Sequence, residues 1–135
     1  MPFYECFVPA GILTADQKAC LAQEITRIHC AATGAPESFV NVLFQTVQPG
    51  DLYTAGQPST AVRIRGSIRA GRSPEVKTQI LTEISALWTR VTGRSVEDLT
   101  VSLIDVPAAS TIKGGRRVPE PGQEAEWLAA AGGAR

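Results

Sequence analysis

Along the first fifty positions, a run of strand-forming side chains is followed by hydrophobic residues at helical spacing and then by hydrophobic residues at every second position. Residues 3–8 are rich in strand-forming side chains and predict a strand. Thr14 and Gln17 then form a capping-box pattern, which predicts the start of a helix that ends at Gly34. The apolar stripe of this helix is Leu21, Ile25, Ile28 and Ala32. Alternation over residues 40–44 predicts a second strand.

The same pattern returns 59 residues later, which indicates an internal repeat. Ser73 takes the place of Thr14 as a helix cap, and Pro74 suits the first helical position. The second helix follows there, between strands near 61–68 and 99–105. Its apolar stripe is Ile80, Ile84, Leu87 and Val91.

Two copies of a strand–helix–strand unit define the expected fold class. Each unit needs a right-handed crossover, and two units combine most simply into an α/β two-layer fold. This tandem β-α-β fold has a four-stranded mixed sheet with both helices on one face. We expect a single domain over residues 1–135, with a first repeat at about 2–50, a second at about 60–107 and a C-terminal arm at 108–135.

The expected arm differs from the repeats in composition. Residues 107–122 contain three prolines, three glycines and a basic cluster, which predicts a hairpin or a wrapping arm. Residues 124–131 predict a short helix that carries Trp127. Because such an arm has little core of its own, we expect it to pack on a neighbouring subunit.

Composition and charge exclude several classes of protein. The chain has 135 residues, and 44% of them are hydrophobic, so it can bury a core. Its net charge is zero, which argues against nucleic acid or an anionic membrane as a partner. No apolar run has the length of a membrane span, and the amino end lacks a secretory signal. Cys6, Cys20 and Cys30 are then expected to be reduced, mostly buried thiols of a cytoplasmic protein.

The amino end offers the first candidate for chemistry. Methionine aminopeptidase removes an initiator Met when the next side chain is small, and Pro2 meets that condition. The free secondary amine that results, held in a partly dry site, is a proton shuttle that no internal residue can imitate. The other interpretation is that Pro2 is only a tolerated start.

Two arginines belong to the second repeat alone. The repeat partners of Arg69 and Arg72 are Ala10 and Leu13, so the fold does not require arginine at either position. Both arginines precede the second helix, whose N-terminus favours anions, and arginine binds a carboxylate with two hydrogen bonds. Apart from Glu75 in the first turn of the helix, no acidic residue lies near them in the sequence, which suggests a missing anionic ligand. A solvated basic loop is the alternative.

His29 is the only histidine, and its repeat partner is Trp88. It lies beside Ile28, at the edge of the first helical stripe. Because the chain has no second histidine and no acidic cluster near this one, a metal site is not expected. A lone histidine on a helix is also consistent with a hydrogen-bonded core or surface residue, so its role stays open at this point.

These features together resemble a known family. The resemblance rests on Pro2, on the two strand–helix–strand units, on Arg-Ala-Gly-Arg-Ser at 69–73 and on Pro-Glu-Pro-Gly-Gln-Glu-Ala-Glu-Trp at 119–127. The chain is similar to the tautomerase superfamily, and most closely to the branch of cis-3-chloroacrylic acid dehalogenase, from Pro2 to about Trp127. The resemblance implies a homotrimer in which the tail contacts neighbouring subunits.

The resemblance also implies roles for several residues. Pro2 matches the catalytic proline of the family, and His29 matches the helix histidine that helps to hold the substrate. Arg69 and Arg72 match the two arginines that bind the substrate carboxylate. Arg116 matches an arginine of the same pattern, which makes it a candidate residue of the pocket.

Two positions depart from the family pattern. Ser102 stands where the dehalogenase has a tyrosine, and Lys113 stands where it has the glutamate that activates water. Without that base, hydration and dehalogenation are not expected. A lysine near Pro2 also favours the neutral amine, where a carboxylate would favour the protonated one. The substitutions therefore favour tautomerisation over hydration.

The expected activity is that of a tautomerase, an isomerase that acts on a small 2-oxo or 2-hydroxy-alkenoic acid without a metal or an organic cofactor. The expected partners are this small carboxylic acid and further copies of the chain. Three alternatives stay open. The chain could be a hydratase, dehalogenase or decarboxylase of three-carbon acids, a non-catalytic binder of small acids, or an enzyme for a larger substrate that uses the room left by Ser102.

Overall fold

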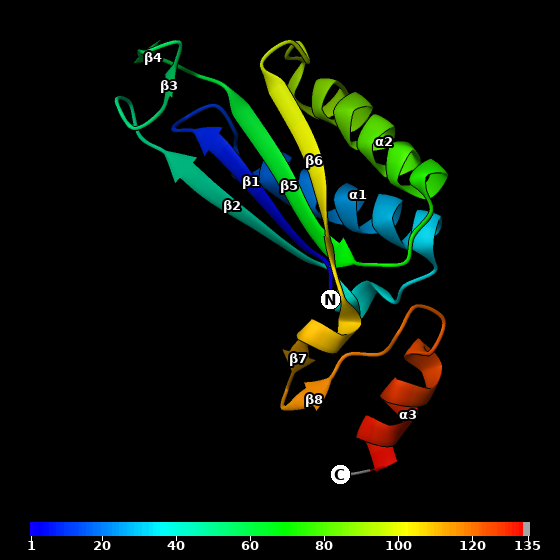
Figure 1. Cartoon of the computed structure of the whole chain (residues 1–135). Helices are drawn as coiled ribbons and strands as arrows, with labels where there is room; N and C mark the ends of the chain where they lie inside the picture. Colours follow the sequence, from blue (N-terminus) through cyan, green and yellow to red (C-terminus); the bar gives the residue numbers. More distant parts are fainter. Residues whose placement is uncertain (134–135) are drawn as a thin grey trace.

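The computed structural model of the chain describes residues 1–133. Its centre is a four-stranded sheet in the order β2-β1-β5-β6, with two long helices on one face (Figure 1). The strands are β1 (Phe3–Pro9), β2 (Asn41–Val47), β5 (Val62–Arg69) and β6 (Leu99–Val106), and the helices are α1 (Ala15–Thr33) and α2 (Pro74–Thr92). The pairs β1–β2 and β5–β6 are parallel, whereas β1 and β5 are antiparallel. The predicted mixed sheet and tandem β-α-β fold are confirmed.

The two helices begin and end at the predicted residues. The Thr14 hydroxyl accepts a hydrogen bond from the Gln17 amide, and the Gln17 side chain accepts one from the Thr14 amide. Ser73 caps α2 by accepting from the amide of Val76. Gly34 ends α1 in the left-handed region, with φ of 74°, where glycine carries no steric penalty.

The core lies between the sheet and the helices. Both apolar stripes are buried there against the inward side chains of the strands. The inward side chains of β1 (Tyr4, Cys6 and Val8) and of β5 (Val62, Ile64 and Ile68) all carry even numbers. Because side chains alternate between the faces of a sheet, an odd offset of 59 residues would place one set outward.

In the first strand, the offset between the two repeats therefore differs by one residue from the offset of 59 in the helices. The helices keep the offset, but the connection from β5 to α2 (70–73) is one residue shorter than that from β1 to α1 (10–14). The structural partner of Arg69 is thus Pro9, and the expected partner, Ala10, is wrong. Leu13 and Arg72 still correspond, because each directly precedes its helix cap.

The segment between the repeats holds elements that the sequence pattern did not predict. It contains a short hairpin of β3 (Tyr53–Thr54) and β4 (Gln57–Pro58). The 3-10 turn η1 (Glu37–Phe39), which was not predicted either, lies within the first repeat, before β2. A second such turn, η2 (Ala108–Ser110), follows β6. Their short length leaves no hydrophobic period to detect.

The C-terminal arm consists of a hairpin and a helix, as predicted. The hairpin pairs β7 (Ile112–Lys113) with β8 (Arg116–Arg117), and α3 (Glu124–Gly133) follows. Gly114 and Gly115 form the turn with φ of 59° and 78°, and a two-residue hairpin turn favours this combination. The arm lies at the end of the sheet that holds the amino terminus (Figure 1).

Two smaller expectations have different outcomes. The cysteines are not mostly buried: only Cys6 is buried, Cys20 is exposed and Cys30 is half-buried, because the last two lie beside the apolar stripe of α1. No helix within residues 1–133 has both the length and the apolar character needed to cross a bilayer.

Candidate active site

The amino end of the chain lies where β5 and the arm meet. Because β1 runs antiparallel to β5, its first residue, Phe3, pairs with Ser67, close to the end of β5 at Arg69. Pro2 is buried, and its carbonyl accepts a hydrogen bond of 3.0 Å from the Asn41 amide. The structure includes Met1, so the Pro2 nitrogen there belongs to a peptide bond.

The electrostatic surroundings of this end are cationic. Burial, and then the charges of Arg69 and Lys113, hold the pKa of the Met1 amino group below its ordinary value. An arginine from β5 and a lysine from the arm therefore both act on the amino terminus. The topology thus brings Arg69 and Lys113, which are far apart in the sequence, to the same amine.

Arg69 is almost completely buried, with 3% of its surface exposed. One terminal nitrogen, Nη1, donates to the Pro119 carbonyl at 2.8 Å, and the other, Nη2, donates to Glu124 Oε1 at 2.7 Å. Its guanidinium also lies over the ring of Phe39, 5.5 Å from the centroid. These contacts satisfy a buried cation and fix its orientation.

Arg72 connects the start of α2 with the end of α1. Its Nη1 donates to the Thr33 carbonyl at 2.9 Å, in the last turn of α1, where the helix dipole favours a cation. Its Nη2 lies 3.8 Å from Glu124 Oε1. The Arg72 guanidinium therefore makes fewer hydrogen bonds to the protein than the Arg69 guanidinium.

The expectation that this arginine pair lacks an acidic partner is wrong. Glu124 supplies the carboxylate from α3, and its Oε2 accepts from the Gly122 amide at 2.9 Å. Partial burial opposes its ionisation, but hydrogen bonds from Arg69 and from backbone amides, with the charge of Arg69, leave the pKa of Glu124 below its ordinary value. Sequence proximity could not reveal this pair, because 55 residues separate Arg69 from Glu124.

His29 is buried near the end of α1, with 2% of its surface exposed. Its Nδ1 lies 2.8 Å from the Tyr4 hydroxyl, and the two rings meet edge to face at 5.7 Å. Burial, followed by the charges of Arg72, Arg69 and the amino terminus, lowers the pKa of His29 to about 4. The imidazole is therefore neutral at pH 7, and the charge of Arg69 acts on it as it does on the amino end.

The three remaining candidates differ in position. Lys113 lies 5.8 Å from the centroid of the Phe39 ring, the ring that Arg69 also covers, so it belongs to the cationic group.

Arg116 stacks on Trp127 at 4.0 Å and donates to the Trp127 carbonyl, so it holds α3 to the hairpin. Ser102 pairs in register with Arg65 on β5, midway along the edge strand β6 and apart from the cluster.

The structure thus gathers the amino end, His29, Arg69, Arg72 and Lys113, and does not bring Ser102 or Arg116 into that group. Sequence analysis missed Tyr4, Phe39 and Glu124. The strand pattern placed Tyr4 only as a strand former, and nothing in the pattern marked Phe39 or Glu124 as partners of an arginine. Among residues 1–133, no three His, Cys, Asp or Glu side chains lie close enough to hold a metal ion.

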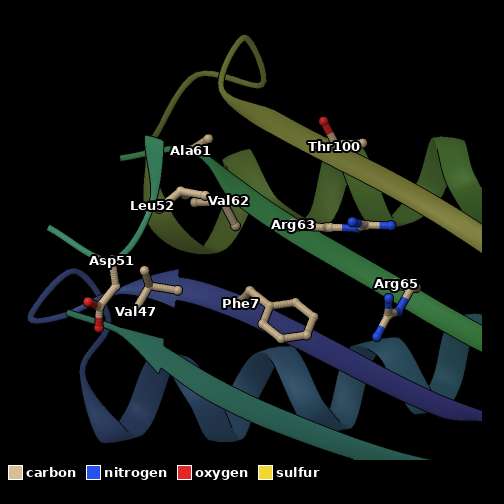
Figure 2. A pocket seen from close by; sticks show the side chains of 9 residues that line it. All are labelled: Phe7, Val47, Asp51, Leu52, Ala61, Val62, Arg63, Arg65 and Thr100. Atoms are coloured by element: carbon tan, nitrogen blue, oxygen red, sulfur yellow. The ribbon is translucent and has the colours of Figure 1, made fainter. Parts of the chain in front are cut away.

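A separate groove of about 420 Å³ lies on the sheet face opposite the helices (Figure 2). Figure 2 shows Phe7, Arg63 and Arg65 along it. Arg65 is half-buried and pairs with Glu5 at 3.1 Å, whereas Arg63 is exposed. The exposed apolar side chains of this open face are Phe3, Leu43 and Ile104.

The arrangement at the amino end has a definite chemical capacity. Guanidinium groups bind a small carboxylate with directional hydrogen bonds, and a neutral imidazole can donate one more. Positive charge and partial burial keep an amine in its unprotonated, basic form. These are the requirements for holding a small acid and moving a proton on it.

Comparison with known proteins gives a family match and similar solved structures. The chain matches the family model Tautomerase_3, whose description names an oxalocrotonate tautomerase enzyme, over residues 1–131. N1, a member of the cis-3-chloroacrylic acid dehalogenase family, is 30% identical with a TM-score of 0.88, and the match covers 94% of this chain and 90% of that one. No curated protein matches the sequence.

Two further solved structures are similar. Native Ps01740 is 41% identical with a TM-score of 0.81, and the match covers 82% of this chain and 99% of that one. The R7 fused 4-OT, an asymmetric trimer, is 25% identical with a TM-score of 0.77, and the match covers 85% of this chain and 94% of that one. The chain therefore belongs to the tautomerase superfamily, to its Tautomerase_3 family and to the branch that resembles cis-3-chloroacrylic acid dehalogenase.

Proposed function

We propose that the chain, after removal of Met1, is a cofactor-independent keto–enol tautomerase of the cytoplasm that acts on a small 2-oxo or 2-hydroxy-alkenoic acid. One observation carries the proposal: the amino end, His29, Arg69, Arg72 and Lys113 converge at one end of the sheet. Family membership supports a reaction of this superfamily.

In this proposal the Pro2 nitrogen is the general base. The cations that lower the pKa of the Met1 amine lie close enough to act on the Pro2 amine, one residue further in. A secondary amine that is neutral at pH 7 can take a proton from the substrate oxygen or carbon and return it to another carbon. The negative charge of the enolate develops beside guanidinium groups, which stabilises the transition state.

The substrate carboxylate binds to Arg72 and Arg69, and it has to compete with Glu124. Arg69 already donates to Pro119 and Glu124, whereas Nη2 of Arg72 is 3.8 Å from the nearest glutamate oxygen. The incoming carboxylate therefore reaches Arg72 first and displaces Glu124 from the pair. A site with one internal carboxylate favours a substrate with a single carboxylate at this position.

Lys113 favours tautomerisation over the addition of water. Its ammonium lies near the amino end and cannot act as a base for water while it is charged. The same charge favours the neutral form of the Pro2 amine. Hydration or dehalogenation of three-carbon acids is therefore the alternative that this lysine disfavours.

The test is the rate of ketonisation of phenylpyruvate enol and of 2-hydroxymuconate, followed by ultraviolet absorbance. We expect Pro2→Ala to lower kcat/KM by roughly 100-fold or more, because the amine loses its geometry and basicity. Equal rates for the two proteins would remove Pro2 from the mechanism. Halide release from a 3-haloacrylate would instead favour the dehalogenase alternative.

We also propose that the chain forms a homotrimer through the open face of its sheet. Phe3, Leu43 and Ile104 are exposed there, and the groove of Figure 2 lies on the same face. Light scattering on Leu43→Lys should show smaller particles than the unchanged chain. Thr78→Lys, at an exposed position of α2, is the matched control and should leave the particle mass unchanged.

A further inference from the structure

The hydrogen bond between Tyr4 and His29 is the most deeply buried side-chain contact of the site. Tyr4 has none of its surface exposed and His29 has 2%, and their atoms Oη and Nδ1 are 2.8 Å apart. The contact joins β1 to α1 across 25 residues of sequence. It therefore links the strand that begins at Pro2 directly to the imidazole that faces the arginines.

The sheet leaves room for this contact at one position. A Cβ atom on Gly66, the partner of Tyr4 on β5, would lie 2.5 Å from Cε1 and 2.8 Å from Cδ1 of the tyrosine ring. Real Cβ atoms do not approach carbon so closely, so any larger residue at this position would displace the ring. Gly66 thus allows Tyr4 to reach His29.

The position of the proton follows from the partners available. The Tyr4 hydroxyl carries one hydrogen, and Nδ1 of His29 is its hydrogen-bond partner within residues 1–133. If Nδ1 carried a proton and donated it to Tyr4, the buried hydroxyl hydrogen would have no acceptor, which is strongly unfavourable. Tyr4 therefore donates and Nδ1 accepts, and the proton of the neutral ring is on Nε2.

We infer that Tyr4 is a positioning residue that fixes His29 in the Nε2–H tautomer, so that a neutral imidazole presents an N–H donor to an oxygen of the bound acid. The inference rests on the proposed function for the identity of that acid, but the tautomer itself does not depend on turnover. Within residues 1–133, Nδ1 is the one ring nitrogen of His29 that is hydrogen-bonded, which leaves Nε2 for a ligand.

A neutral donor suits a site that already holds several cations. An imidazolium would add a further positive charge beside Arg69, Arg72 and the amino terminus. A neutral ring with its lone pair on Nε2 would accept from a guanidinium and would repel a carboxylate. The tautomer set by Tyr4 is thus the form that adds a hydrogen bond to the acid without adding charge.

The test is nitrogen NMR of the imidazole, which the chain makes unambiguous because His29 is its only histidine. At pH 7 we expect a protonated Nε2 and an unprotonated, hydrogen-bonded Nδ1 in the unchanged protein. Tyr4→Phe keeps the ring and removes the hydroxyl, so the signals should move toward a mixture of tautomers. A protonated Nδ1 in the unchanged protein, or unchanged signals in Tyr4→Phe, would overturn the inference.

Tyr53→Phe is the matched control, because Tyr53 is the other tyrosine of the chain and is 58% exposed. It should leave both the NMR signals and the kinetics unchanged. We expect Tyr4→Phe to lower kcat/KM for enol ketonisation by roughly tenfold, the loss of about one hydrogen bond to the substrate. A chain that has the predicted tautomer but no turnover would contradict the proposed function alone.

Discussion

The two β-α-β units place different residues in the same structural positions. His29 in α1 and Trp88 in α2 are 59 residues apart, and both are almost completely buried. In both units, a large buried ring fills this position. In the second unit an apolar ring fills it, and in the first an imidazole does so because Tyr4 satisfies its nitrogen.

The ends of the two units differ in the same way. The strand–helix connection of the first unit carries Leu13 where that of the second carries Arg72, and Pro9 corresponds to Arg69. Cations placed in the second unit thus face an imidazole placed in the first. The duplicated fold supplies two equivalent scaffolds, and the site arises where they differ.

Truncation of Trp88 should have the largest effect on stability. Trp88→Ala removes a buried ring, and we expect the free energy of unfolding to fall by about 3–5 kcal/mol. His29→Phe keeps a buried ring, so it should cost less stability yet abolish the hydrogen bond to the substrate. Urea unfolding and enol ketonisation measured on both variants check this. Full activity of His29→Phe would contradict the view that the imidazole of the first unit serves the reaction whereas the ring of the second unit only fills space.

The free energy of unfolding should depend on pH through His29, which only the first unit carries. The unfolded imidazole takes up a proton near pH 6.5 and the folded one only near its pKa of about 4, so acid favours the unfolded chain. The contribution of His29 is complete above about pH 6.5 and is lost toward pH 4. Between pH 7.5 and pH 4.5 we expect a fall of roughly 2–3 kcal/mol.

His29→Phe is the control for this titration, because it keeps the other groups that titrate in acid, including Glu124. Its free energy of unfolding should change less over the same interval. Identical pH profiles of the two proteins in urea unfolding would show that His29 is not held neutral by the fold.

Gly66→Ala tests whether the close packing of β5 against Tyr4 holds the contact between Tyr4 and His29. The added Cβ would press on the Tyr4 ring and on Leu103, and overpacking of this kind costs roughly 1–3 kcal/mol. Because the pressure moves Tyr4, the nitrogen signals of His29 should change as well. Urea unfolding and imidazole NMR measure the two effects. A variant with normal stability and an unchanged imidazole would contradict the packing account.

Glu124→Gln should have the smallest effect, and an effect of the opposite sign on affinity. Removing the internal carboxylate leaves Arg72 and Arg69 free for an external one, so pyruvate should bind roughly tenfold more tightly, a change of about 1.4 kcal/mol. Glu126→Gln, at an exposed position of the same helix, should leave the affinity unchanged. Weaker or equal binding by Glu124→Gln in calorimetry would show that Glu124 does not compete.

The regular parts of the fold were predictable because their signals are local. Caps at Thr14 and Ser73, the two apolar stripes and the glycines that end the helices all lie within a few residues of the features they specify. The repeat then gave the topology. The repeat gave the wrong partner for Arg69. The connection from β5 to α2 is one residue shorter than that from β1 to α1, which leaves the helix pattern intact but shifts the strand.

The contacts of the site were not predictable in the same way. Tyr4 meets His29 across 25 residues, and Arg69 meets Glu124 across 55. Hydrophobic periodicity reports which face of an element is buried, but it carries no information about which polar groups meet across elements. The absence of an acid near Arg69 in sequence was therefore a poor guide to its partner in space.

The claim that the Pro2 nitrogen is the catalytic base has one most direct test. Two preparations of the unchanged sequence, verified by intact mass, differ only in that one begins at Pro2 and the other retains Met1. The account predicts that the first accelerates the ketonisation of phenylpyruvate enol and that the second, whose Pro2 nitrogen is an amide, does not. Equal acceleration by both preparations would contradict it.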